Sequence, residues 1–334
     1  MIDRSFAPPR RKRVAVLAGG DSPEREVSLR SGRAVSRALT VRGHRAVAID
    51  PAVTDPAEMD WSLFDAAFIA LHGTYGEDGT IQTILDRAGV PYTGSDAATS
   101  RLAFSKSAAK ERFIHHKLPT PPYVLVHSSD ARERIRAQAE RIGYPLVVKP
   151  DAQGSSLGVT IVRAPAALDA AIAECFRFGS FGLIEKAIPG TEWTVGMLDD
   201  LPLPACRITS RREFYDYDAK YADDETKYEF EFDLPREAVA AIERVGREAC
   251  RALDTRGMAR ADLRVDEQLR PWLLEVNTIP GLTDHSLVPK AAARIGLSFG
   301  DLCERALESA LASSMDDSSP RSAHRGISPT LATR

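Results

Sequence analysis

The fold is decided by residues 260–277, which begin Arg260-Ala261-Asp262-Leu263-Arg264-Val265 and, after a polar turn, end Trp272-Leu273-Leu274-Glu275-Val276-Asn277. Polar and apolar residues alternate in both halves, and a short polar segment separates them, so the stretch predicts an antiparallel hairpin. Because side chains alternate faces along a strand, Arg260 shares a face with Asp262, and Glu275 shares one with Asn277.

The register of this hairpin depends on its turn. If residues 267–270 form a four-residue loop, counting back along the strands gives three cross-strand pairs: Asp266 with Pro271, Asp262 with Glu275, and Arg260 with Asn277. The opposite face is then apolar and buried, and consists of Leu263, Val265, Leu274 and Val276.

Two carboxylates and an amide on one face suggest a metal site. Asp262, Glu275 and Asn277 offer hard oxygen ligands, which suit Mg²⁺ bound to nucleotide phosphates. Without a cation, Asp262 and Glu275 would repel each other at short range. The alternative is an exposed hairpin face that carries ordinary Arg–carboxylate pairs.

A glycine-rich turn lies further upstream, in residues 148–158 (VKPDAQGSSLG). Its small residues would let backbone N–H groups approach phosphate oxygens, and Ser155 and Ser156 add hydroxyl donors. It matches neither the Walker pattern nor GxGxxG, so an ordinary hairpin turn is an open alternative. Lys149 and Lys106 could supply positive charge to phosphates or could be solvated surface lysines.

The N-terminal part reads as a strand at residues 13–18, Gly19-Gly20, and a helix that starts near Asp21. This order is typical of a dinucleotide-binding site. The third glycine of the GxGxxG motif is missing, however, and Glu24 places a negative charge where a pyrophosphate would bind. Glu24 is either a capping-box residue or a carboxylate that orients a ligand.

The alternation of strands (13–18, 44–49, 66–71, 90–93) with helices predicts a parallel sheet, so the fold class is α/β at the N-terminus. Further strands are expected at 145–149, 159–162 and 182–186, and helices at 106–116 and 236–253. The predicted modules are residues 1–95, 96–187 and 188–312. The remainder, 313–334, has few large apolar residues and is expected to be a disordered tail.

Composition places the chain among ordinary globular proteins, with 334 residues, 43% hydrophobic and 27% charged. A net charge of −3 provides no bulk basic field for nucleic acid. No apolar run is long enough for a membrane helix, and the basic start lacks a signal-peptide core. The four isolated cysteines fit reduced thiols, so we expect a cytoplasmic protein.

Nine segments occur in one order that is shared with a known family. They are residues 24–28 (EREVS), 70–73 (ALHG), 76–79 (GEDG), 91–95 (PYTGS), 148–150 (VKP), 154–156 (GSS), 215–221 (YDYDAKY), 275–281 (EVNTIPG) and 285–289 (HSLVP). From Val14 to about Leu311, the chain therefore resembles the D-alanine–D-alanine ligases of the ATP-grasp superfamily.

The resemblance implies a three-module ATP-grasp enzyme, cytoplasmic and homodimeric, that uses ATP and Mg²⁺ or Mn²⁺, with two ions expected. ATP would phosphorylate the carboxylate of one D-alanine, and the amine of a second would attack the acyl phosphate. The product would be the dipeptide used in peptidoglycan synthesis.

The resemblance also implies roles for residues of this chain. The catalytic set would be Glu24, Ser155, Tyr221, Arg260, Gly281 and Ser286. D-alanine would be bound by Glu24, His72, Ser286 and Leu287. ATP would be bound by Lys106, Lys149, Ser155, Ser156, Glu185, Lys186, Ile188, Glu192 and Lys220. The metal ligands would be Asp262, Glu275 and Asn277.

Three alternatives remain at this stage. A ligase of the same class could join D-alanine to D-lactate or D-serine. A nicotinamide dehydrogenase is disfavoured by the missing third glycine, and an inactive ATP-grasp module by the intact metal set. The chain also departs from the family at Ala152-Gln153, where a charged pair is common, and at the acidic segment 228–234.

Overall fold

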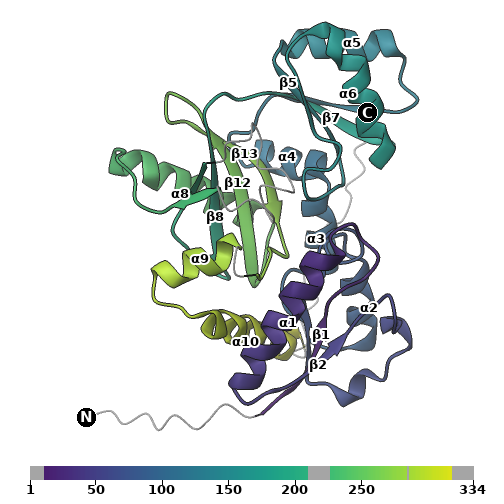
Figure 1. Ribbon diagram of the computed structural model, residues 1–334, viewed down its shortest axis with the longest axis vertical. Helices are drawn as coiled ribbons and strands as arrows, with labels where there is room; N and C mark the ends of the chain where they lie inside the picture. The colour runs from purple at the N-terminus through teal and green to yellow at the C-terminus, as the bar shows by residue number, and fades with distance from the viewer. Residues whose placement is uncertain (1–10, 210–225, 284–285, 318–334) are drawn as a thin grey trace, which may run out of the picture.

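The computed structural model describes residues 11–209, 226–283 and 286–317. Its strands form three sheets, which follow one another along the long axis of the molecule in Figure 1: the N-terminal sheet at the bottom, the sheet within residues 191–277 at mid-height, and the sheet within residues 123–186 at the top. In these ranges no helix has the length and apolar character needed to cross a bilayer.

The N-terminal sheet is parallel, as predicted, with the order β2-β1-β3. Its strands are β1 (Arg13–Leu17), β2 (Arg45–Ile49) and β3 (Ala66–Ile69), and its helices are α1 (Arg25–Val41) and α2 (Thr80–Ala88). Short 3-10 turns, Pro56–Glu58 and Trp61–Leu63, precede β3. Both faces of the sheet are buried: Val14 and Val16 pack toward α1, and Ala15 and Leu17 toward α2. The expected strand at 90–93 forms only one bridge, between Ala67 and Tyr92.

The second sheet in chain order, called the middle sheet for its place in the sequence, is antiparallel, with the order β4-β7-β5-β6. Its strands are β4 (Tyr123–His127), β5 (Leu146–Pro150), β6 (Thr160–Val162) and β7 (Phe181–Lys186). Two helices, α3 (Ala97–Phe104) and α4 (Lys106–His115), lead into it. The helices α5 (Arg132–Ile142) and α6 (Leu168–Cys175) bury one of its faces, and 3-10 turns at Pro165–Ala167 and Phe176–Phe178 flank α6.

The third sheet has the order β11-β10-β8-β12-β13, with β9 beside β8. Its strands are β8 (Thr191–Leu198), β9 (Leu201–Pro202), β10 (Cys206–Thr209), β11 (Lys227–Glu229), β12 (Met258–Val265) and β13 (Pro271–Asn277). Helix α8 (Arg236–Ala252) packs on it through Ile242, Val245 and Ala249. Helices α9 (Leu287–Arg294) and α10 (Phe299–Asp317) complete the described chain.

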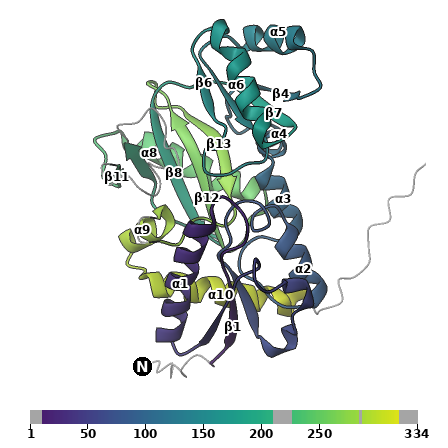
Figure 2. The same cartoon turned by 45° about the vertical axis from the view of Figure 1, so that its right-hand side comes forward.

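Helix α10 returns to the N-terminal module and lies beside α1 (Figures 1 and 2). Its Leu302, Ala306 and Leu307 share a core with Val35 and Leu39 of α1. The helix also continues to Asp317, so the predicted start of a disordered tail at residue 313 is wrong by five residues, and residues 318–334 lie outside the described chain.

The hairpin β12–β13 confirms the functional half of the predicted register, since Asp262 pairs with Glu275 and Arg260 with Asn277. The predicted turn is wrong, because Val265 rather than Asp266 pairs with Pro271. A bulge between Asp262 and Leu263 absorbs the one-residue difference. Consequently Leu273, not Leu274, is buried in the core, while Leu274 lines a pocket.

Candidate active site

The larger of two adjoining pockets lies between the middle and third sheets and has a volume of about 140 Å³. Most residues that the sequence assigned to ATP line it: Lys106, Lys149, Ser156, Glu185, Lys186, Ile188 and Glu192. Apolar side chains that could pack on a purine line it as well: Val147, Ile161, Ile188 and Leu274. The pocket therefore combines an apolar surface with lysines and carboxylates, as a nucleotide requires.

A buried charge cluster forms part of the wall of this pocket. Lys149 Nζ lies 2.6 Å from Glu185 Oε1, and Lys110 Nζ lies 2.9 Å from Glu185 Oε2. The two ammonium groups hold the pKa of the Glu185 carboxyl below its usual range, although burial alone would raise that pKa. Sequence reasoning missed Lys110, and its only signal is the spacing of four from Lys106 on α4.

The hairpin face at the rim of this pocket carries the proposed metal ligands. Asp262 accepts hydrogen bonds from Arg260 at 2.8 and 2.7 Å, and Thr194 Oγ1 donates to it at 2.9 Å. Asn277 Nδ2 lies 3.0 Å from Asp262 Oδ2, and Lys106 Nζ lies 3.1 Å from Glu275 Oε2.

The side chains of Arg260 and Asp262 are each only 13% exposed. This burial contradicts the alternative of a freely exposed hairpin face. Within the described chain no group of three His, Cys, Asp or Glu residues suggests a metal site. Two carboxylates and an amide nevertheless fit a hard divalent cation that is also bound by phosphate oxygens.

The smaller pocket, of about 50 Å³, joins the N-terminal module to the hairpin. It is lined by most of the residues assigned to catalysis and D-alanine: Glu24, His72, Ser155, Arg260, Gly281, Ser286 and Leu287. Glu275 lines both pockets and therefore marks their junction.

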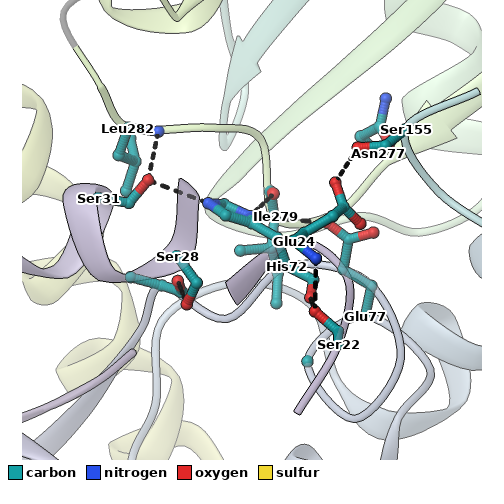
Figure 3. Close-up of polar contacts among 12 residues, drawn as sticks. Ser22, Glu24, Ser28, Ser31, His72, Glu77, Ser155, Asn277, Ile279 and Leu282 are labelled. Carbon is teal, nitrogen blue, oxygen red and sulfur yellow. Dashed lines mark hydrogen bonds and ion pairs between the residues drawn. The ribbon is translucent and has the colours of Figure 1, made fainter. Parts of the chain in front are cut away.

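Glu24 is buried and reaches across from α1 to the glycine-rich turn, where its carboxylate accepts a hydrogen bond from Ser155 Oγ (Figure 3). It makes no side-chain capping bond to α1, so the capping-box interpretation is wrong. A side chain at Gly154 would place Cβ 2.6 Å from Glu24 Oε2, so any larger residue would have to displace the Glu24 carboxylate.

Both ring nitrogens of His72 have protein partners (Figure 3). Nδ1 lies 3.2 Å from the carbonyl oxygen of Ile279 and must carry a hydrogen, because a carbonyl only accepts. In the neutral ring Nε2 then accepts from Ser31 Oγ at 3.0 Å, and the oxygen of Ser31 accepts in turn from the backbone N–H of Leu282. His72 therefore fastens the loop after β13 to the N-terminal module.

Glu77 is a pocket residue that the sequence analysis quoted but did not assign. It lines the smaller pocket near His72 and Glu24 (Figure 3). Burial, together with the negative charge of Glu24, raises the pKa of the Glu77 carboxyl, although His72 opposes this shift.

The two remaining residues that the resemblance assigns to D-alanine lie where helix α9 begins. Ser286 occupies its N-cap position and Leu287 is its first residue. Ser286 Oγ accepts from the backbone N–H of Thr283 at 2.9 Å and so leaves the first N–H groups of α9 without a side-chain cap. Such a helix start favours a carboxylate. Tyr221 and Lys220 lie outside the described residues.

The backbone N–H groups of Gly19 and Gly20, after β1, are not available to a dinucleotide. Gly19 N–H donates to Ser28 Oγ at 2.8 Å, and Gly20 N–H donates to Asp50 Oδ1 at 2.9 Å. Arg25 bonds the same Asp50 at 2.7 Å and lowers the pKa of its carboxyl. These N–H groups and this carboxylate are already engaged, which contradicts the dehydrogenase alternative.

Comparison with known proteins identifies the relatives of the chain. Two family models match it, "D-ala D-ala ligase N-terminus" over residues 51–95 and "D-ala D-ala ligase C-terminus" over residues 113–308. The D-alanine–D-alanine ligase of Gloeobacter violaceus is 42% identical over 300 residues, which cover 90% of this chain and 99% of that protein. The one from Geotalea uraniireducens is 45% identical over 302 residues, covering 90% and 96%.

Solved structures of D-alanine–D-alanine ligases have a fold similar to that of this chain. The D-alanine–D-alanine ligase of Bacillus anthracis complexed with ATP has a TM-score of 0.80 and 29% identity, and covers 92% of this chain and 99% of that one. The ligase of Coxiella burnetii shares the fold with a TM-score of 0.79 at 22% identity, covering 92% and 96%.

Proposed function

This chain belongs to the D-alanine–D-alanine ligase family, and we propose how its residues divide the ATP-dependent joining of two D-alanines. The observation that carries the proposal is the junction of the two pockets at Glu275. A nucleotide in the larger pocket would direct its terminal phosphate toward a D-alanine in the smaller one.

In the first step, an oxygen of the D-alanine carboxylate forms a bond to the γ-phosphorus, and the bond from that phosphorus to ADP breaks. Lys106 and Lys149 bind the phosphates, and the apolar wall of the pocket packs on adenine. Glu24 binds the ammonium group of this first D-alanine, held in place by Ser155. When bound by Asp262, Glu275 and Asn277, Mg²⁺ or Mn²⁺ supplies positive charge to the phosphates.

In the second step, the amine of another D-alanine attacks the carbonyl carbon of the acyl phosphate, the bond from that carbon to the phosphate oxygen breaks, and inorganic phosphate leaves together with the proton that the nitrogen loses. In this proposal, Arg260 and the N–H of Gly281 stabilise the oxyanion that forms on that carbon. The carboxylate of the second D-alanine binds Ser286 and Leu287 at the start of α9. In this proposal Tyr221 belongs to the catalytic residues, and Lys220 binds ATP.

The decisive experiment is a phosphate-release assay with ATP, Mg²⁺ and single or paired substrates. We expect release that requires D-alanine, together with D-alanyl-D-alanine in the mass spectrum. L-alanine should give none. A depsipeptide as the main product from mixed D-alanine and D-lactate would instead support the alternative ligase.

Three further expectations belong to the proposal. We propose a homodimer, a cytoplasmic location and two metal ions at the site. The modules 1–95, 96–187 and 188–312 are proposed as units, with the qualification that α10 adds to the core of the first. Light scattering of the purified protein tests the dimer, and metal titration against activity tests the ions.

A further inference from the structure

Lys110 is a completely buried lysine for which the proposed mechanism has no use. It lies on α4 with no exposed surface, behind the wall of the larger pocket rather than in its lining. Its Nζ donates to Thr120 Oγ1 at 2.6 Å and lies 2.9 Å from Glu185 Oε2. The ring of Tyr123 lies beside it, with its centre 5.4 Å from Nζ.

The charge balance of this cluster depends on Lys110. Lys149 faces the pocket, but its Nζ is only 2.6 Å from Glu185 Oε1. A lysine paired with one carboxylate forms a neutral unit that attracts phosphate weakly. A second ammonium on the same carboxylate leaves one positive charge in excess. Water screens little here, because the side chains of Lys110, Lys149 and Glu185 are 0%, 7% and 3% exposed.

We propose that Lys110 is a positioning residue that neutralises Glu185 and thereby keeps the charge of Lys149 available to the ATP phosphates. The inference rests on the proposed assignment of Lys149 to those phosphates. A purely structural role explains the cluster less well, because apolar residues of similar volume often stabilise a protein core as well as buried ions do.

The first test is Lys110→Met, which keeps the volume of the side chain and removes its charge. The KM for ATP should rise about tenfold, which corresponds to ~1.4 kcal/mol of binding. The KM for D-alanine and the kcat should stay within about twofold, because the charge acts on the nucleotide pocket alone. Lys117→Met, at the exposed residue 117 just after α4, is the matched control and should change none of these constants.

The second test separates charge from packing and does not depend on the stability of the single variant. In a Glu185→Gln background the amide keeps an acceptor but loses the charge that favours protonation of the buried Lys110, so Lys110 is a neutral amine there and Lys110→Met removes no charge. Adding Lys110→Met to Glu185→Gln should therefore change the KM for ATP by less than about twofold. An equal loss in both backgrounds, or a loss shared by the KM for D-alanine, would show that Lys110 only supports packing.

These outcomes are distinct from failure of the proposed function. If the wild-type protein releases no phosphate in the presence of D-alanine, the ligase proposal fails. If release is normal and only the pattern of the variants differs, the proposal for Lys110 fails and the ligase remains. Calorimetry of ADP binding measures the nucleotide affinity of the wild type and of each variant, whether or not phosphate is released.

Discussion

Glu275 is the residue at which the two pockets meet, and its carboxylate is balanced by Lys106 at 3.1 Å. Its side chain is 25% exposed, so it contributes little to packing. A residue with these properties contributes to the reaction much more than to the stability of the fold.

We therefore expect Glu275→Gln to lower turnover by about a hundredfold or more, comparable to the loss of one stabilising group at a transition state. The melting temperature should remain within a few degrees of wild type, because Lys106 Nζ keeps its hydrogen bond to the carbonyl oxygen of Gln153 and the repulsion between Glu275 and Asp262 is relieved. Steady-state kinetics over a range of Mg²⁺ concentrations checks this. Glu267→Gln, an exposed carboxylate in the same hairpin loop, is the control. Wild-type turnover of Glu275→Gln at ordinary Mg²⁺ would contradict the metal assignment.

The titration of Lys110 gives a second prediction at this scale. Burial lowers the pKa of Lys110 from 10.5 to about 8. The titratable groups that act on it are Glu185, Lys149, Tyr123 and Glu275. As the pH rises through 8, Lys110 loses its proton, and Glu185 then offsets Lys149 fully.

The KM for ATP should accordingly rise between about pH 7.5 and 9 in the wild type and stay flatter in Lys110→Met. The stability effect has the opposite sign. Between pH 8 and 10.5 the unfolded chain holds more protons at this lysine, so its contribution to the free energy of unfolding increases with pH. Kinetics and chemical denaturation across this range measure the two effects, and an unchanged KM in the wild type would refute the first.

At the scale of elements, the bulge in β13, where Leu274 is the extra residue, decides which of two neighbouring leucines faces the core. Leu273 is fully buried under α8, and Leu274 lines the larger pocket. The bulge therefore keeps Glu275 opposite Asp262 while the turn closes one residue differently.

This arrangement predicts different outcomes for two matched substitutions. Leu273→Ala should destabilise the protein by about 2–5 kcal/mol, the usual cost of a cavity left by leucine in a core. Leu274→Ala should leave stability nearly unchanged and raise the KM for ATP. Urea unfolding and ATP kinetics of both variants measure this. If Leu274→Ala lost stability and Leu273→Ala did not, the result would instead support the predicted register without a bulge.

The hairpin also shows what the sequence can predict. The pairs Asp262–Glu275 and Arg260–Asn277 follow from alternation, and the strand and helix pattern of the N-terminal sheet follows from apolar runs. The bulge could not be predicted, because leucine occupies both 273 and 274 and either can be buried. Helix α5 was missed because it is polar, with only Ile135 and Ala139 buried. Lys110 was missed because burial of a lysine depends on partners from distant strands.

At the scale of the whole molecule, the first and last parts of the described chain form one core. His44, just before β2, contacts both carboxylate oxygens of Glu304 on α10 at 3.0 Å, and Arg42 forms an ion pair with Asp301. The N-terminal module is therefore incomplete until α10 is present.

Two truncations test this. Removal of residues 299–334 should unfold the N-terminal module, because it exposes the apolar residues that α10 covers on α1. Removal of residues 318–334 should leave the melting temperature and D-alanyl-D-alanine synthesis unchanged, because that segment has few large apolar side chains. Calorimetry and circular dichroism of both proteins check this, and a native-like melt without α10 would contradict it.

The same packing has a consequence during synthesis on the ribosome. His44 and Glu304 are 260 residues apart in the chain. At about 5–20 residues per second, translation needs roughly 13–50 s to reach the second after the first. Throughout that interval Val35 and Leu39 of α1 lack the cover that α10 gives them in the folded protein. The nascent chain should therefore engage chaperones early and release them only when α10 leaves the exit tunnel.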